Sequence, residues 1–207
     1  MCGMSQNTEK QSRPLGEMIK LGLILVCYAV ASCTVLAIVN NFTSVRIQQN
    51  RIEKANAAMK EVFATADSFE PVSDFEGSDN PSISVSDFYI AKKDGKTVGA
   101  VVQVAGPTYE KAKLIVGVQA DGTVTGMRIL EISDSPGFGL KASDPTFKLA
   151  NGKTFFGQFE GKDAKNAFKA GDNFDSISGA TITSVGIAAM MNQGCSVMLK
   201  YLGEHHE

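Results

Sequence analysis

The chain is 207 residues long and carries a formal net charge of −2 at pH 7. This near-neutral balance argues against a nucleic-acid partner, because nucleic-acid binding needs a strongly basic face. The length is sufficient for one globular domain with an appendage.

The first predicted element is a membrane-spanning helix over residues 21–39, a stretch without a charged residue. A helix of this length extends about 28 Å, close to the ~30 Å hydrocarbon core of a bilayer. A buried core helix is one alternative, although few soluble helices are apolar on every face. A cleaved signal is another, since Val30-Ala31-Ser32-Cys33 resembles the pattern before a lipidated bacterial cysteine. The apolar run is long for a signal peptide, which favours a retained anchor.

Basic residues flank this span in nearly equal number, so the positive-inside comparison does not decide its orientation. They are Lys10, Arg13 and Lys20 before the span and Arg46, Arg51 and Lys54 after it. A long domain that follows a single anchor can be exported largely regardless of charge. We therefore expect residues 1–20 to form a polar cytoplasmic tail.

Two segments are expected between the anchor and the domain. Residues 45–66 have apolar side chains at helical spacing, which predicts a helical stalk that could continue the membrane helix. Residues 67–87 hold six acidic residues, no basic residue and two prolines. This composition predicts an exposed acidic loop, which serves either as a solvated connector or as an interaction surface.

Residues 88–207 are predicted to form one α+β domain. Alternating apolar runs flank the Asp-Gly pairs at residues 94–95 and 121–122, which is a strong signal for two β-hairpins. The expected strands are residues 88–92, 97–104, 113–120 and 123–132. A short helix is possible over residues 162–169, and residues 185–202 read as a closing helix with Thr183 or Ser184 as its N-cap. An antiparallel sheet followed by a packing helix is typical of the α+β class.

Cysteine usage restricts the cofactors that the domain can hold. Of four cysteines, only Cys195 lies in the predicted domain, and the others lie in the tail or the anchor. No disulfide, iron–sulfur cluster or zinc site of cysteines can form there. His205 and His206 end the chain and are more typical of a frayed tail than of metal ligands. A redox role would therefore require an organic cofactor, and we predict no metal site.

The segment from Asp175 to Thr181, Asp-Ser-Ile-Ser-Gly-Ala-Thr, directly precedes the closing helix. A helix N-terminus presents free N–H groups and the positive end of the helix dipole, and so favours a phosphate. The small residues Gly179 and Ala180 would let a phosphate approach the backbone closely. Thr181 is either a structural residue or the place where a phosphate is held or bonded. A threonine hydroxyl is a poor nucleophile, so bonding would require an external base or metal-assisted partner.

The pattern D-x-x-[ST]-G-A-T, after an anchored α+β domain, resembles the FMN-binding domain family of Rnf-type electron-transport complexes. The resemblance implies that Thr181 forms a phosphodiester with FMN. It also implies that a separate magnesium-dependent flavin transferase installs this group from FAD. Asp175 would position the segment or be recognised by the transferase, with a simple turn residue as the alternative. Ser178, Gly179 and Ala180 would lie beside the cofactor.

A second loop supports the same resemblance. Residues 134–141, Asp-Ser-Pro-Gly-Phe-Gly-Leu-Lys, are similar to the family's E-T-P-G-L-G-x-K loop and keep an acid, a hydroxyl and an apolar group. The resemblance implies that the loop borders the flavin, with Phe138 against the ring and Lys141 offsetting negative charge. An ordinary Pro-Gly turn is the alternative. The candidate flavin contacts here are Ser135, Pro136, Gly137, Phe138, Gly139 and Lys141. Residues 106–109 depart from the family's Gly-Tyr-Gly-Gly stretch, and no flavin contact is assigned to them.

Taken together, the resemblance implies a membrane-anchored electron-transfer subunit that carries covalent FMN. Its partners would be the membrane and iron–sulfur subunits of an Rnf-type ferredoxin:NAD⁺ oxidoreductase that moves Na⁺ or H⁺. The protein would be anchored once in the inner, cytoplasmic membrane, with residues 88–207 on the extracytoplasmic side. Two other functions stay open: a stand-alone flavinylated reductase, and an anchored assembly module without a cofactor in which Thr181 is structural.

Overall fold

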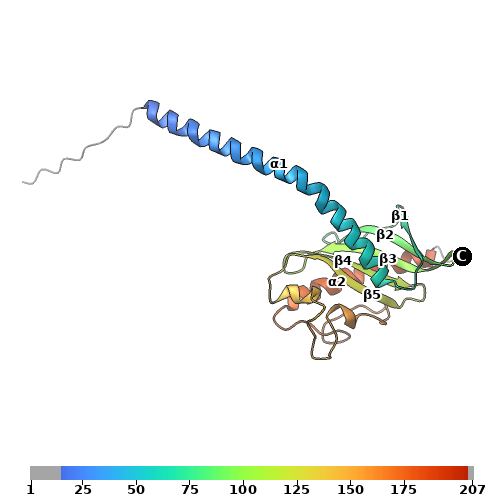
Figure 1. Ribbon diagram of the computed structural model, residues 1–207. Coiled ribbons are helices and arrows are strands. Elements are labelled where there is room, and N and C mark those ends of the chain that lie inside the picture. The colour runs from blue at the N-terminus through green and yellow to red at the C-terminus, as the bar shows by residue number, and fades with distance from the viewer. Residues whose placement is uncertain (1–14, 205–207) are drawn as a thin grey trace, which may run out of the picture. The chain divides into compact units, whose positions relative to one another are not determined.

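The computed structural model describes residues 15–204, and its contacts divide the chain into two units that meet between Arg51 and Ile52. Helix α1 (Leu15–Val62) is continuous and contains both the predicted anchor and most of the predicted stalk (Figure 1). The predicted tail of residues 1–20 lies mostly outside the described residues, and residues 15–20 already belong to α1. His205 and His206 also lie outside them.

Helix α1 is long and apolar enough to cross a membrane, and none of its most apolar window is buried. The closing helix α2 (Thr181–Glu204) is also long and apolar enough to cross a membrane, but 56% of its most apolar window is buried. Burial of that kind is expected for the core helix of a globular domain. The exposed apolar side chains of α1 agree with the predicted membrane span.

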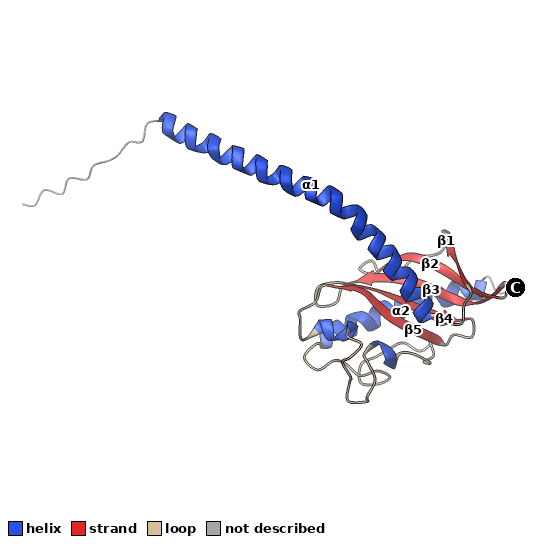
Figure 2. Ribbon diagram, in the orientation of Figure 1, coloured by secondary structure: helices blue, strands red, loops and turns tan. Residues whose placement is uncertain are grey.

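Five antiparallel strands form the sheet of the unit from Ile52 onward, in the order β1-β2-β3-β4-β5 (Figure 2). The strands are β1 (Ser68–Val72), β2 (Ser84–Lys93), β3 (Lys96–Gly106), β4 (Ala112–Gln119) and β5 (Val124–Ile132). Both predicted hairpins are confirmed. Asp94 and Gly95 each have positive φ between β2 and β3, as a tight two-residue hairpin turn requires.

The predicted acidic loop over residues 67–87 is wrong at both ends. Strand β1 and the start of β2 occupy its flanks. Strand β1 pairs with the later part of β2, from Ser68 with Lys92 to Val72 with Phe88. Pro71 is tolerated in β1 because this strand lies at the edge of the sheet, where one row of backbone N–H groups needs no partner.

Both faces of the sheet are covered within the unit from Ile52 onward. On one face, α2 places Ile187, Met191 and Met198 in a core with Val102, Val116 and other strand residues. On the other face, the end of α1 packs Met59, Val62 and Phe63 against Val101 and Ile115. Two covered faces explain why β3 and β4 are buried along almost their whole length rather than at alternate positions. The α+β class is confirmed. The layer that the end of α1 forms on the second face of the sheet was not predicted.

The segment between the sheet and α2 is mostly irregular, with two short 3₁₀ helices, η1 (Gly139–Ser143) and η2 (Phe156–Gln158). The short helix predicted over residues 162–169 is absent from this described segment. Asp163 instead accepts a hydrogen bond from the backbone N–H of Lys165 at 2.9 Å. The side-chain oxygen of Asn192 accepts one from the backbone N–H of Phe168 at 2.7 Å. These bonds favour turns over helix.

Candidate functional site

Helix α2 begins at Thr181, four residues before the predicted start of the closing helix. Gly179 has φ of +78°, a left-handed conformation that most residues avoid, and it turns the chain into the helix. The N–H of Ala180 donates to the carbonyl of Ile177 at 2.9 Å, and the N–H of Ser184 donates to the carbonyl of Ala180 at 3.0 Å. Thr181 is thus the first helical residue, and its side chain is exposed.

The prediction that Thr183 or Ser184 is the N-cap is wrong, because both residues lie inside the first turn and are buried. The Ser184 hydroxyl donates to the carbonyl of Ala180 at 2.9 Å and accepts the N–H of Ile177 at 3.0 Å. Ser184 therefore fastens the small-residue segment before Thr181 to the helix that follows it.

Asp134 is the centre of the second loop's contacts, directly after β5. Its carboxylate is only 2% exposed and accepts four hydrogen bonds. The donors are the Thr108 hydroxyl at 2.6 Å, the Glu110 N–H at 2.9 Å, the Tyr109 N–H at 3.3 Å and the Thr183 hydroxyl at 2.5 Å. Burial raises the pKa of the Asp134 carboxyl, but these four donors outweigh burial and hold the pKa below its usual value.

Gly139 allows this arrangement because its α-carbon lies against Asp134 and Thr183. A Cβ at Gly139 would stand 2.6 Å from Asp134 Cβ and 2.7 Å from Thr183 Oγ1, closer than atoms can approach. Gly139, which was predicted to contact the cofactor, therefore has a packing role as well. It lets the 3₁₀ helix η1 close over the Asp134–Thr183 pair.

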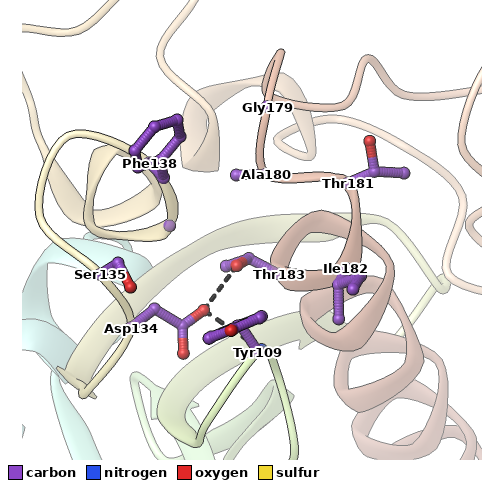
Figure 3. Close-up of a pocket in the computed structure, with 10 residues that line it drawn as sticks. Tyr109, Asp134, Ser135, Phe138, Gly179, Ala180, Thr181, Ile182 and Thr183 are labelled. Carbon is purple, nitrogen blue, oxygen red and sulfur yellow. Dashed lines mark hydrogen bonds between the residues drawn. The ribbon is translucent and has the colours of Figure 1, made fainter.

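A pocket of about 470 Å³ lies where these two segments meet (Figure 3). Thr181 and Gly179 border it from the head of α2, Ser135 and Phe138 from the loop after β5, and Tyr109 from the β3–β4 loop. The full lining is Tyr109, Asp134, Ser135, Phe138, Gly139, Gly179, Ala180, Thr181, Ile182 and Thr183. The volume lies within the range of about 300–1,000 Å³ that is usual for small-molecule sites.

The chemistry of this pocket fits FMN. The head of a 24-residue helix presents backbone N–H groups that lack intrahelical acceptors, as a phosphate requires. Phe138 and Tyr109 are 56% and 64% exposed and offer aromatic faces to a planar ring. The exposed hydroxyl of Thr181 stands at the helix end of the same pocket.

Five predicted cofactor residues do not line this pocket: Asp175, Ser178, Pro136, Gly137 and Lys141. The Asp175 carboxylate accepts a hydrogen bond from Asn151 Nδ2 at 2.8 Å, and its backbone exchanges two bonds with the side chain of Gln158. Lys141 lies over the Phe147 ring, 5.2 Å from its centre. Gly137 shapes the turn with φ of +79°. Asp175, Lys141 and Gly137 therefore support the two loops rather than border the pocket.

Four lining residues were not predicted as cofactor contacts: Tyr109, Asp134, Ile182 and Thr183. Tyr109 lies in the stretch that departs from the family pattern. Its aromatic ring was therefore the only feature that could have indicated a contact with the cofactor. Thr183 follows Thr181 by two positions, and the sequence pointed only to a capping role. Within residues 15–204, no group of three or more His, Cys, Asp or Glu side chains is placed to hold a metal ion.

Two family models match the chain. The FMN-binding domain model matches residues 108–196, and the RnfG N-terminal region model matches residues 6–62. The first covers every residue that lines the pocket, and the second covers α1. Residues 63–107, which include β1 to β3, lie between the two matched ranges.

Relatives of the same kind align along most of the chain. The G subunit of the Na⁺-translocating ferredoxin:NAD⁺ oxidoreductase complex from Acetobacterium woodii is 34% identical over 200 residues, covering 87% of this chain and 91% of that relative. The G subunit of the ion-translocating oxidoreductase complex from Methanosarcina acetivorans is 29% identical, with 81% and 87% covered. The G subunit of the proton-translocating ferredoxin:NAD⁺ oxidoreductase complex from Clostridium ljungdahlii is 27% identical, with 89% and 92% covered. The chain belongs to the family of G subunits of ion-translocating, Rnf-type oxidoreductase complexes, which carries an FMN-binding domain.

Proposed function

We propose that this chain is a membrane-anchored electron-transfer subunit that carries FMN on Thr181 through a phosphodiester bond. The observation that carries the proposal is the position of Thr181. Its exposed hydroxyl is the first side chain of α2, at the end of the pocket that Phe138 and Tyr109 border. A bound flavin supplies one- and two-electron transfer, and the protein supplies position and electrostatics.

The attachment requires one bond to form and one to break. Thr181 Oγ1 attacks the FMN-side phosphorus of FAD, the pyrophosphate bond breaks, and AMP leaves with its electron pair. The hydroxyl proton passes to a base on the flavin transferase. This external base is needed because Asp134, the carboxylate among the lining residues, is buried with four donors on its oxygens and is directed at Thr183.

The pocket's own residues would then hold the two ends of the group. The first N–H groups of α2 lie beside the phosphate, where the helix dipole stabilises negative charge. Phe138 and Tyr109 pack against the ring, and their exposure leaves one side of the ring open to a redox partner. A covalent link suits this open pocket because it keeps the cofactor at high effective concentration.

The apolar helix α1 and the family support a membrane location for this chemistry. We propose that α1 crosses the cytoplasmic membrane once and that the domain lies on the extracytoplasmic side. The partners are the other membrane subunits and iron–sulfur subunits of an Rnf-type ferredoxin:NAD⁺ oxidoreductase complex. The relatives include both a Na⁺-translocating and a proton-translocating complex, so family membership is compatible with either coupling ion.

The test is covalent loading of the purified full chain. The chain is co-expressed with a flavin transferase and measured by intact mass, with Thr181→Ala as the test variant and Thr146→Ala as the control. Thr146 is exposed and lies outside the pocket. The proposal expects wild type and Thr146→Ala to gain the mass of FMN less one water, and Thr181→Ala to gain nothing. Wild-type protein without this gain would contradict it, as would loaded Thr181→Ala.

A further inference from the structure

Two threonines lie in the first turn of α2, and their hydroxyls have opposite environments. Thr181 is exposed, whereas Thr183 is only 2% exposed. Residues two positions apart on a helix point about 200° apart around its axis. In Figure 3 the Thr183 hydroxyl points toward Asp134 and the Thr181 hydroxyl points away from it. The rotation of the first turn therefore decides which hydroxyl faces the pocket's open side.

The contact that sets this rotation is the hydrogen bond from Thr183 Oγ1 to Asp134 Oδ2, at 2.5 Å. A buried bond to a charged acceptor is among the stronger hydrogen bonds in proteins. Asp134 is itself held by the Thr108 hydroxyl and by the backbone N–H of Glu110. The carboxylate thus joins the head of α2 to the β3–β4 loop and to the end of β5.

The surroundings of this pair leave it little freedom. Gly139 packs so closely that a Cβ there would lie 2.7 Å from both Asp134 Oδ2 and Thr183 Oγ1. A rotation of the first turn would break the bond and leave a buried carboxylate short of one donor, which is costly. The packed state therefore favours one rotation of the helix start.

We propose that Asp134 is a positioning residue that presents the Thr181 hydroxyl for flavin attachment and withholds the Thr183 hydroxyl. This inference rests on the proposed attachment at Thr181 and assigns a role to a residue that does not touch the transferred group. Asp134 acts through Thr183 and the first turn of α2. Loss of either side of the pair lets the turn rotate and fray, so the attacking oxygen is correctly placed for a smaller fraction of the time.

The test compares the rate of covalent loading in full-length variants, measured by intact mass with purified flavin transferase, FAD and Mg²⁺. Thr183→Val removes the hydroxyl at nearly constant shape, and Thr183→Ser restores it. Asp134→Ala removes the acceptor. Asp121→Asn is the matched control, because Asp121 also accepts a backbone N–H, from Thr123 at 2.7 Å, but is exposed in the β4–β5 turn.

We expect Thr183→Val and Asp134→Ala to load at least about tenfold more slowly than wild type, consistent with the loss of a charged buried hydrogen bond. Thr183→Ser and Asp121→Asn should load within about twofold of wild type, as expected when the bond is kept. Hydrogen exchange of the unloaded chains gives a second readout that needs no flavin. The amide of Ser184, which donates to the Ala180 carbonyl, should exchange faster in Thr183→Val than in Thr183→Ser.

Circular dichroism and thermal unfolding verify that each variant is folded. If Asp134→Ala does not fold, the Thr183→Val and Thr183→Ser pair decides the question. Folded Thr183→Val that loads at the wild-type rate, with unchanged exchange at the Ser184 amide, would overturn the positioning role. Wild-type protein that never loads would overturn the proposed attachment itself, so the two failures are distinguishable.

Discussion

Gly186 of α2 lies directly against the backbone of Pro107 in the β3–β4 loop. A Cβ at Gly186 would stand 2.5 Å from the Pro107 carbonyl oxygen and 2.9 Å from the Thr108 α-carbon. The contact brings the helix and the loop close enough for Thr108 and Thr183 to share the Asp134 carboxylate. A glycine in mid-helix, which costs helix propensity, is thereby explained by close packing at the pocket.

Replacement of Gly186 by alanine should therefore force the loop that carries Tyr109 away from the helix. We expect a loss of about 1–3 kcal/mol in the free energy of unfolding, because backbone atoms yield less readily than side chains. Denaturant unfolding of the full chain in detergent measures this change. The control is Gly203→Ala in the same helix, where no atom lies within 4 Å of the new Cβ. There we expect no loss and a gain of up to about 1 kcal/mol. Equal effects of the two substitutions would contradict the packing role of Gly186.

The stability of the protein should depend on pH through Asp134. Burial opposes its charge, but its four hydrogen bonds hold its pKa in the folded protein below the usual value. The unfolded state then binds more protons in acid, so this stabilisation is present above about pH 4 and is lost as pH falls through the folded pKa. Wild type should have a larger free energy of unfolding than Asp134→Asn at neutral pH, and this difference should become smaller in acid. A difference that stays constant from pH 7 to pH 3 would contradict this prediction.

Cys195 should be inert in the folded protein. It is fully buried in the core beside the sheet, and burial raises the pKa of its thiol to about 12. Thiolate is the reactive form, so almost none is available at pH 8. In a chain with serine at Cys2, Cys27 and Cys33, a thiol reagent should modify Cys195 only after denaturation. Rapid reaction of the native chain would show that the core opens at this position.

Tyr109 should hold the flavin ring without controlling its attachment. Its side chain is 64% exposed, so Tyr109→Ala should change the free energy of unfolding by less than about 0.5 kcal/mol. Covalent loading at Thr181 should persist, whereas the flavin's fluorescence anisotropy should fall because one aromatic wall is missing. The control is Val185→Ala, which alters an exposed residue of α2 outside the pocket lining. An anisotropy unchanged by Tyr109→Ala would remove Tyr109 from the ring site.

Local sequence patterns predicted most of the sheet and both long helices. The Asp-Gly pairs specify their hairpins through residues that accept positive φ, and such turns need no distant partner. Strand β1 was missed because Ser68-Phe69-Glu70-Pro71-Val72 is polar and contains a proline. It becomes a strand only because β2 offers it an edge to pair with. The predicted helix at residues 162–169 failed for a related reason, since Asn192 in α2 holds its backbone in a turn.

The site could be predicted only where its residues are close in sequence. The segment that ends at Thr181 and the loop with Phe138 were both located by motif, and both border the pocket. The bond between Asp134 and Thr183 joins residues 49 positions apart, and no local pattern encodes it. Tyr109 enters the pocket for the same reason, because Gly186 allows the β3–β4 loop to lie against α2.

Locating the flavin within the chain tests attachment at Thr181 most directly. Trypsin should release residues 170–200 as one peptide that contains Ser176, Ser178, Thr181, Thr183, Ser184 and Ser196. Tandem mass spectrometry of this peptide from protein loaded by a flavin transferase distinguishes the six hydroxyls. We expect FMN to be attached through its phosphate to Thr181 alone, with Thr183 and Ser184 unmodified. Attachment at any other hydroxyl, or an unmodified peptide from loaded protein, would contradict this expectation.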